Sequence, residues 1–189
     1  MNWLKHKLRK LLIICYNFLL IIDVQFIKKN KSTIVLDIDN TLADTWPTLK
    51  NENINNFSNE KHRISSLNLI NGAFDLVKYS SKKFDQIIFL SARNPAHYFI
   101  TKKWIDSNFK KISYKLRLVP NVNLKQIYWE KIIKISNETV IIDDLSYNHE
   151  NNDTKFYNNE INYLQSNSSI KYFGYADICD GLSNIQNKI

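Results

Sequence analysis

The sequence predicts an α/β protein with a Rossmann-like, doubly wound parallel sheet. Apolar, β-branched segments typical of buried strands alternate along the chain with segments of helical periodicity. Three strand segments end in polar side chains, which are Asp37 with Asp39, Ser91 with Arg93, and Asp143 with Asp144. Because the carboxyl ends of parallel strands meet at one edge of a sheet, we expect these side chains to form one composite site.

Length and composition predict a single globular domain over residues 32–189, preceded by a distinct segment, residues 1–31. A chain of 189 residues with 44% hydrophobic residues can bury a sizeable core. Cys15 and Cys179 are far apart and no two histidines have metal-ligand spacing, which argues against a disulfide framework or a zinc site. We therefore expect a reducing, cytoplasmic setting.

Residues 1–31 are basic and amphipathic. They hold seven Lys or Arg residues against Asp23, so the segment carries +6 of the net charge of +8. Leu4, Leu8 and Leu11 begin an apolar stripe at helical steps, which predicts a helix. The apolar run, residues 11–22, is shorter than the ~20 residues needed to span a bilayer, and no small-residue cleavage site follows it. Three interpretations stay open: packing on the core or a second subunit, peripheral contact with a membrane surface, or an uncleaved anchor.

The first half of the main domain begins with a predicted buried strand, residues 33–36. A polar, Asn-rich stretch, residues 51–59, predicts a loop, and a helical stripe predicts a helix over 64–79. A second buried strand is predicted at 86–90. Asn94 and Pro95 then have the pattern of an N-cap with proline at the first helical position, so a helix is expected through residue 109.

The second half continues the alternation of strands and helices. A strand is predicted at 114–119 and a helix at 124–135, with apolar residues on one side. Further strands are predicted at 139–142 and 170–173, and a closing helix at 178–189. The alternation favours parallel strands joined by helical crossovers.

Asp37 and Asp39 follow a buried strand directly, which is an unusual place for two carboxylates. Like charges repel, and removing them from water is costly, so a divalent cation would stabilise the pair. An Asx-type turn at the end of the strand is the alternative interpretation.

The pattern D-x-D-x-T, from Asp37 to Thr41, resembles motif I of the haloacid dehalogenase (HAD) superfamily, which is mostly phosphatases. The resemblance implies that Asp37 is the nucleophile and forms an aspartyl-phosphate, and that Asp39 is the general acid and base. Thr41 and Ser91, the latter matching motif II, would bind the phosphoryl group.

Asp143 and Asp144 match the acidic motif IV of the same superfamily. The resemblance implies that they hold Mg²⁺ together with Asp37 and the backbone carbonyl of Asp39. We expect Asp144 to bind the metal directly and Asp143 to lie behind it. The fold implied is a HAD fold with a minimal cap or none, because only 49 residues separate Thr41 from Ser91.

Two basic residues complete the predicted phosphate site. Of the lysines that precede the Asp pair, Lys125 is favoured over Lys131 and Lys134 as the motif III lysine, because a cation in a first helical turn opposes the helix dipole and calls for an anionic partner. Arg93 would clamp the phosphate or, alternatively, form a surface salt bridge.

Residues 101–106 and 124–129 resemble the 3′-phosphatase domain of phage-type polynucleotide kinase-phosphatases. Residues 102–134 also carry a net +7, which would suit nucleic acid, but no kinase P-loop or nucleic-acid-binding module is evident. We therefore expect an Mg²⁺-dependent phosphatase acting on a small metabolite, such as a sugar, alditol or amino-alcohol phosphate of surface-glycan synthesis. The alternatives are a polynucleotide 3′-phosphatase and an inactive, membrane-attached binding protein.

Overall fold

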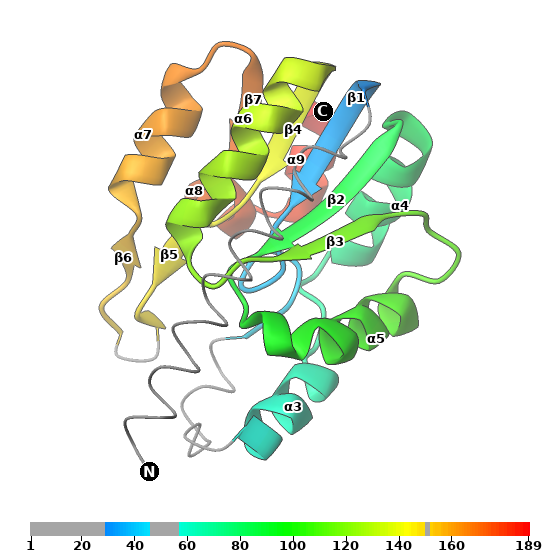
Figure 1. The fold of residues 1–189 in the computed structure, drawn as a ribbon, viewed down its shortest axis with the longest axis vertical. Helices are drawn as coiled ribbons and strands as arrows, with labels where there is room; N and C mark the ends of the chain where they lie inside the picture. Colours follow the sequence, from blue (N-terminus) through cyan, green and yellow to red (C-terminus); the bar gives the residue numbers. More distant parts are fainter. Residues whose placement is uncertain (1–28, 46–56, 150–151) are drawn as a thin grey trace, which may run out of the picture.

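The computed structural model describes residues 29–45, 57–149 and 152–189, and every structural statement below concerns these residues. The helix predicted within residues 1–31 lies almost wholly outside this part, as does most of the loop predicted at 51–59. A five-stranded parallel sheet forms the centre of the fold, with helices on both faces (Figure 1). The predicted doubly wound α/β architecture is confirmed. None of the described helices is both long and apolar enough to cross a bilayer.

The strands follow the order β3-β2-β1-β4-β7 across the sheet. They are β1 (Asn30–Leu36), β2 (Gln86–Ser91), β3 (Lys115–Leu118), β4 (Ser136–Ile142) and β7 (Ile170–Phe173). From β1 the chain proceeds outward through β2 to β3, then returns to β4 on the other side of β1 and proceeds to β7. The direction of winding therefore reverses between β1 and β4, and ligands of such sheets bind at the carboxyl ends of the strands at this point.

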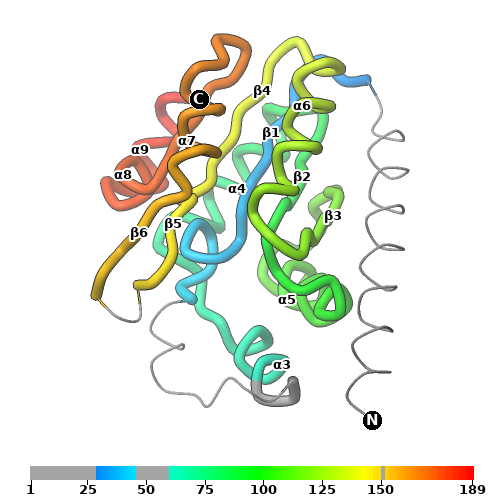
Figure 2. The backbone as a smooth tube through the Cα atoms, turned by 60° about the vertical axis from the view of Figure 1, so that its left-hand side comes forward, coloured from blue at the N-terminus to red at the C-terminus, as the bar shows by residue number. Residues whose placement is uncertain are grey.

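The two faces of the sheet bury separate apolar clusters because side chains alternate along each strand. Ile34 and Leu36 pack on one face with helices α4 (Ala73–Lys83), α5 (Tyr98–Asn108) and α9 (Leu182–Lys188). Val35 packs on the other with α6 (Lys125–Ile135) and α7 (Asn158–Ser166). Figure 2 shows α6 on one side of β1 and α8 and α9 on the other.

The remaining elements are short, apart from one helix. Helix α3 (Phe57–Ser66) packs against α5, and α8 (Tyr175–Cys179) precedes α9. Two 3₁₀ turns, η1 (Pro95–His97) and η2 (Val122–Leu124), lead into α5 and α6. Strands β5 (Ser146–Tyr147) and β6 (Lys155–Phe156) form a small antiparallel hairpin beyond β4.

Three predicted elements were wrong. Residues 64–79 form parts of two helices, α3 and α4, because the chain between them pairs Leu69 with Ala43 and turns at Gly72, whose φ is 83°. Residues 178–189 also contain a break, at Gly181 with φ of 111°, so α8 and α9 replace one closing helix. Positive φ favours glycine, and both breaks were readable from these glycines. Helix α3 also begins inside the predicted loop, at Phe57, and α7 was not predicted.

Candidate active site

The polar ends of β1, β2 and β4 lie together, as the sequence predicts. Asp37 extends β1, since its N–H donates to the Ile142 carbonyl of β4 at 2.9 Å. Asp143 follows β4 in the same way, donating its N–H to the Phe173 carbonyl at 3.1 Å. The sheet ladder thus fixes both backbones, and both carboxylates are buried. This is the edge at which the direction of winding reverses.

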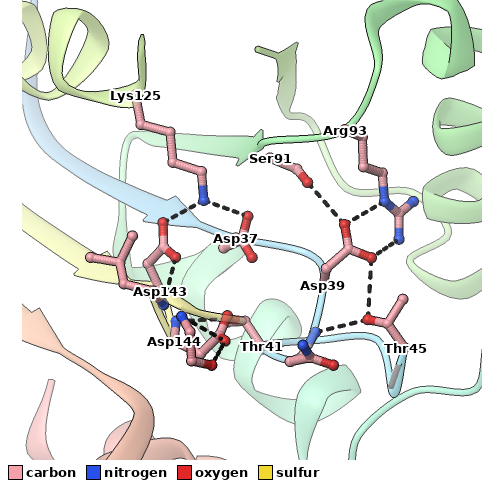
Figure 3. Close-up of polar contacts among 12 residues, drawn as sticks. Asp37, Asp39, Thr41, Thr45, Ser91, Arg93, Lys125, Asp143 and Asp144 are labelled. Carbon is pink, nitrogen blue, oxygen red and sulfur yellow. Dashed lines mark hydrogen bonds and ion pairs between the residues drawn. The ribbon is translucent and has the colours of Figure 1, made fainter. Parts of the chain in front are cut away.

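Lys125 joins two of the carboxylates. Its ammonium donates to Asp37 Oδ1 at 2.8 Å and to Asp143 Oδ2 at 2.7 Å (Figure 3). Lys125 is the first residue of α6 and is only 2% exposed. A buried cation at a helix N-terminus is unfavourable by itself, and the two carboxylates offset this cost. They raise the pKa of Lys125 despite its burial, so the ammonium stays charged.

Asp144 is held on the opposite side from Lys125 by polar groups of two loops. Thr41 Oγ1 donates to Asp144 Oδ1 at 3.2 Å and accepts the Asp144 N–H at 3.1 Å. Asp144 Oδ2 accepts the Ser146 N–H at 3.2 Å and also the Ser146 hydroxyl. Thr41 therefore orients an acidic residue, whereas the sequence comparison with HAD proteins suggested a contact to phosphate. Ser146 was not singled out in the sequence.

The three carboxylates of Asp37, Asp143 and Asp144 form a compact cluster, with one oxygen of each within 4.8 Å of the others. Burial raises the pKa of Asp37 to about 7 and that of Asp144 to about 7, and the nearby carboxylates add to the effect. The pKa of Asp143 rises to about 6, mainly through burial. Three carboxylates against one ammonium leave two negative charges, which a divalent cation would neutralise. Buried carboxylate oxygens also suit Mg²⁺.

Asp39 lies apart from this cluster and is paired with Arg93. The guanidinium makes a bidentate contact, from Nε to Oδ2 at 2.7 Å and from Nη2 to Oδ1 at 2.8 Å. Ser91 and Thr45 hydroxyls donate to the same carboxylate, each at 3.2 Å. Burial acts to raise the pKa of Asp39, but Arg93 outweighs it and holds the pKa below the ordinary value. Asp39 is thus ionised across the neutral pH range.

The Arg93 guanidinium is almost fully engaged within the protein. Besides Asp39, it donates from Nη1 to Thr101 at 3.4 Å and lies 6.0 Å from the centre of the Trp104 ring. The salt bridge considered as the alternative to phosphate binding therefore exists, with the Arg93 side chain buried and the Asp39 side chain 30% exposed. A contact between Arg93 and phosphate would have to compete with Asp39.

A tight turn at Asn40 follows the two aspartates of the first motif. Asn40 has φ of 55°, a left-handed conformation that Asn adopts more readily than most residues. Its N–H donates to the Ala43 carbonyl at 2.8 Å and to the Thr45 hydroxyl at 3.0 Å. The chain thus turns directly after Asp39, which contacts Arg93, whereas Asp37 contacts Lys125.

The site opens into a cavity of about 130 Å³ that both acidic groups line. Asp37, Asp39, Ser91, Lys125 and Asp144 contribute to its walls. Tyr157 and Val122, which the sequence did not indicate, also line it. The cavity is large enough for a phosphoryl group and a few further atoms.

Two histidines and two lysines near the sequence motifs lie outside the acidic cluster. His149 Nε2 lies 2.7 Å from Ser146 Oγ and 4.0 Å from Asp144, so it borders the site. His97 is buried, with Nε2 3.6 Å from Glu60 Oε2, and does not line the cavity. Lys134 is exposed and Lys131 is half-buried on α6, and neither lines the cavity.

Comparison with known proteins supports the fold. No family model matches the sequence, and no curated protein matches it. Among solved structures, the chain is similar to a class C acid phosphatase from Bacillus anthracis with tungstate bound, with a TM-score of 0.52 and 17% identity. The match covers 82% of this chain and 71% of the other. At this identity the similarity shows the fold alone, a parallel α/β sheet flanked by helices as the sequence predicted.

Proposed function

We propose that this protein is a divalent-metal-dependent phosphomonoesterase that works through an aspartyl-phosphate. One observation carries the proposal: Asp37, Asp143 and Asp144 are buried together at the point where the sheet reverses its winding, and Lys125 donates to the first two. When all three carboxyl groups are ionised, a purely structural cluster would leave two buried negative charges without a partner, which is strongly unfavourable. The fold similarity to an acid phosphatase is in accord with this function.

Mg²⁺ is the cation proposed for the site. Asp37 and Asp144 would bind it through their side chains and Asp39 through its backbone carbonyl. Bound there, it would neutralise charge on the phosphoryl oxygens. Asp143 is anchored by Lys125 and by the Leu145 N–H at 3.2 Å, so its proposed part is to hold Lys125 in place.

In the first proposed step, a carboxylate oxygen of Asp37 attacks phosphorus and the bond from phosphorus to the ester oxygen breaks. Lys125, 2.8 Å from Asp37 Oδ1, and Ser91 bind phosphoryl oxygens. In the second step, water attacks the aspartyl-phosphate and the bond between phosphorus and the Asp37 oxygen breaks. Inorganic phosphate leaves and the Asp37 carboxylate is restored.

Asp39 is the proposed acid and base, and its pairing with Arg93 favours the second role. An ionised Asp39 can accept a proton from the attacking water. To protonate the leaving oxygen in the first step, Asp39 must first gain a proton at the expense of the Arg93 contact. Esters with good leaving groups, which need no such proton, are therefore expected to react faster.

The proposed substrate is the phosphate ester of a small metabolite, such as a sugar, alditol or amino-alcohol phosphate. The cavity of about 130 Å³ supports a small substrate. The basic residues of 102–134 do not gather at the site: Lys102 is paired with Asp106, and Lys110, Lys111 and Lys134 are exposed elsewhere. A polynucleotide 3′-phosphatase and an inactive binding protein are the other outcomes that the experiment below distinguishes.

The experiment is a measurement of phosphate release from a panel of small phosphate esters and a 3′-phosphorylated oligonucleotide. We expect turnover with Mg²⁺, none after EDTA treatment, and recovery when Mg²⁺ is restored. Asp37→Asn should abolish turnover while circular dichroism stays unchanged. Asp153→Asn removes an exposed carboxylate elsewhere and should leave turnover as in the wild type. Turnover by Asp37→Asn would refute the proposed nucleophile, and activity on the oligonucleotide alone would replace the proposed substrate class.

A further inference from the structure

The edge of the sheet at the amino ends of the parallel strands is a candidate for a second functional surface. It lies at the opposite end of the sheet from the acidic cluster. Helices α4, α5 and α6 all end at this edge, just before β2, β3 and β4 begin. Figure 1 shows α6 rising to join β4 beside the start of β1. A strand of seven residues is roughly 20 Å long, so this edge is well separated from the catalytic carboxylates.

Seven exposed lysines lie at this edge, and one of them, Lys83, donates to the Ile189 carbonyl. We call the other six the basic face: Lys29, Lys31, Lys82, Lys110, Lys111 and Lys134. Lys29 and Lys31 lie at the start of β1, Lys110 and Lys111 in the loop before β3, and Lys134 in the last turn of α6. These lysines come from four separate chain segments that the fold brings to one edge.

Acidic residues are few at the same edge in the part of the chain that the structure describes. Asp85 and Glu138 are exposed there, and Asp85 already accepts the Ser32 N–H at 2.9 Å. Asp106, in the last turn of α5, is neutralised by Lys102 at 2.6 Å. Six lysines against two carboxylates leave a net charge of about +4, and a surface of this kind attracts anionic partners.

Helix dipoles explain only part of this distribution. Cations in the last turn of a helix are stabilising, which accounts for Lys82 in α4 and Lys134 in α6. Lys29 and Lys31 lie at the start of a strand, and Lys110 and Lys111 lie beyond α5, so the dipole does not require them. Lys111 also adopts φ of 64°, a conformation in which lysine has no advantage over Asn or Gly.

The chain enters the domain at this edge from its most basic and apolar segment. Residues 1–28 contain five of the chain's Lys and Arg residues and the apolar run 11–22, and they lead directly to Lys29 and Lys31. Stable attachment to a membrane usually needs two signals, an apolar one and a basic one. A basic face beside an amphipathic segment provides both.

We propose that the basic face docks on an anionic lipid bilayer, next to the segment that precedes β1. Each lysine near such a surface contributes to binding, and exposed lysines can adapt to mobile headgroups. The acidic site at the carboxyl ends of the strands then faces away from the membrane and stays open to dissolved substrates. A nucleic-acid substrate would instead call for positive charge around the site, which the described residues place at the other end.

The test is binding of the full chain to phosphatidylcholine vesicles with and without about 30% phosphatidylserine, measured by sedimentation. We expect binding that requires the anionic lipid and weakens as salt rises from about 0.15 M to about 1 M. The triple variant Lys110→Gln, Lys111→Gln, Lys134→Gln should bind at least about 30-fold more weakly, given about fivefold for each lysine at full effect.

A charge-matched control keeps this test specific. The triple variant Lys61→Gln, Lys103→Gln, Lys155→Gln removes the same charge from exposed positions on α3, α5 and β6 and should bind within about threefold of the wild type. Equal losses in both triple variants would show an effect of net charge alone and overturn the proposal. Unchanged binding in both would assign all binding to residues 1–28, which also overturns it. Tighter, face-dependent binding to duplex DNA than to vesicles would make nucleic acid the partner instead.

Discussion

The clearest consequence of the buried acidic cluster is an inverted dependence of stability on pH in the absence of metal. Most carboxyl groups in folded proteins have lowered pKa values and stabilise the fold as pH rises. Here, burial raises the pKa of Asp37 from 3.8 to about 7, and that of Asp144 to about 7. Between pH 4 and 7 the folded state therefore binds more protons than the unfolded state, and the free energy of unfolding falls as pH rises.

The size of the effect follows from these pKa values. One carboxyl group whose pKa rises from 3.8 to about 7 costs the fold about 4 kcal/mol on going from below pH 4 to above pH 7. The groups titrate together, so their separate costs do not add. We expect the metal-free protein to lose about 3 to 5 kcal/mol between pH 4 and pH 8. This is a large part of the stability of an ordinary domain.

Urea unfolding in EDTA, followed by circular dichroism at several pH values, measures this loss. Asp144→Asn removes one buried charge, so it should raise the free energy of unfolding at pH 8 and flatten the pH dependence. Mg²⁺ should stabilise the wild type more at pH 8 than at pH 5 and should have little effect on Asp144→Asn. Asp153→Asn, on an exposed carboxylate, serves as the control. Stability that is constant or rises between pH 4 and pH 8 in EDTA would refute the reasoning.

Two further substitutions test the lysine and a backbone turn. Lys125→Met should lower the free energy of unfolding of the metal-free protein at pH 8 by about 3 to 5 kcal/mol, because it leaves buried carboxylates unpaired. The control Lys134→Met, on the exposed side of α6, should change this free energy by less than about 0.5 kcal/mol. Equal urea midpoints for the two variants would contradict the buried ion pairs. Gly72→Ala should lower the free energy of unfolding by about 1 to 3 kcal/mol, because φ is 83° at this position and the new Cβ would lie 3.2 Å from Ser183 Oγ. A melting temperature equal to that of the wild type would contradict this prediction.

The sequence by itself determined the sheet and the acidic residues at its edge. Strands such as 86–90 and 139–142 are short, largely apolar runs that are unfavourable in water, and their alternation with helical stripes indicates parallel pairing. Because the carboxyl ends of parallel strands meet at one edge of the sheet, the sequence alone predicts that Asp37, Asp143 and Ser91 lie together. Lys125 was chosen among three lysines because its position at the start of a helix requires an anion, and the structure places it between Asp37 and Asp143.

Only the tertiary structure decided how the site residues divide into two groups. Local sequence could not show that Arg93 would face Asp39, because 54 residues separate them and the contact depends on the turn at Asn40 and the packing of α5. Nor could it show that Thr41 supports Asp144, 103 residues away. The basic face is also a product of the fold, since its lysines come from segments that are distant in sequence. Periodicity and motifs report which residues are buried or polar, but the partner of each charge is fixed only when the sheet and helices pack.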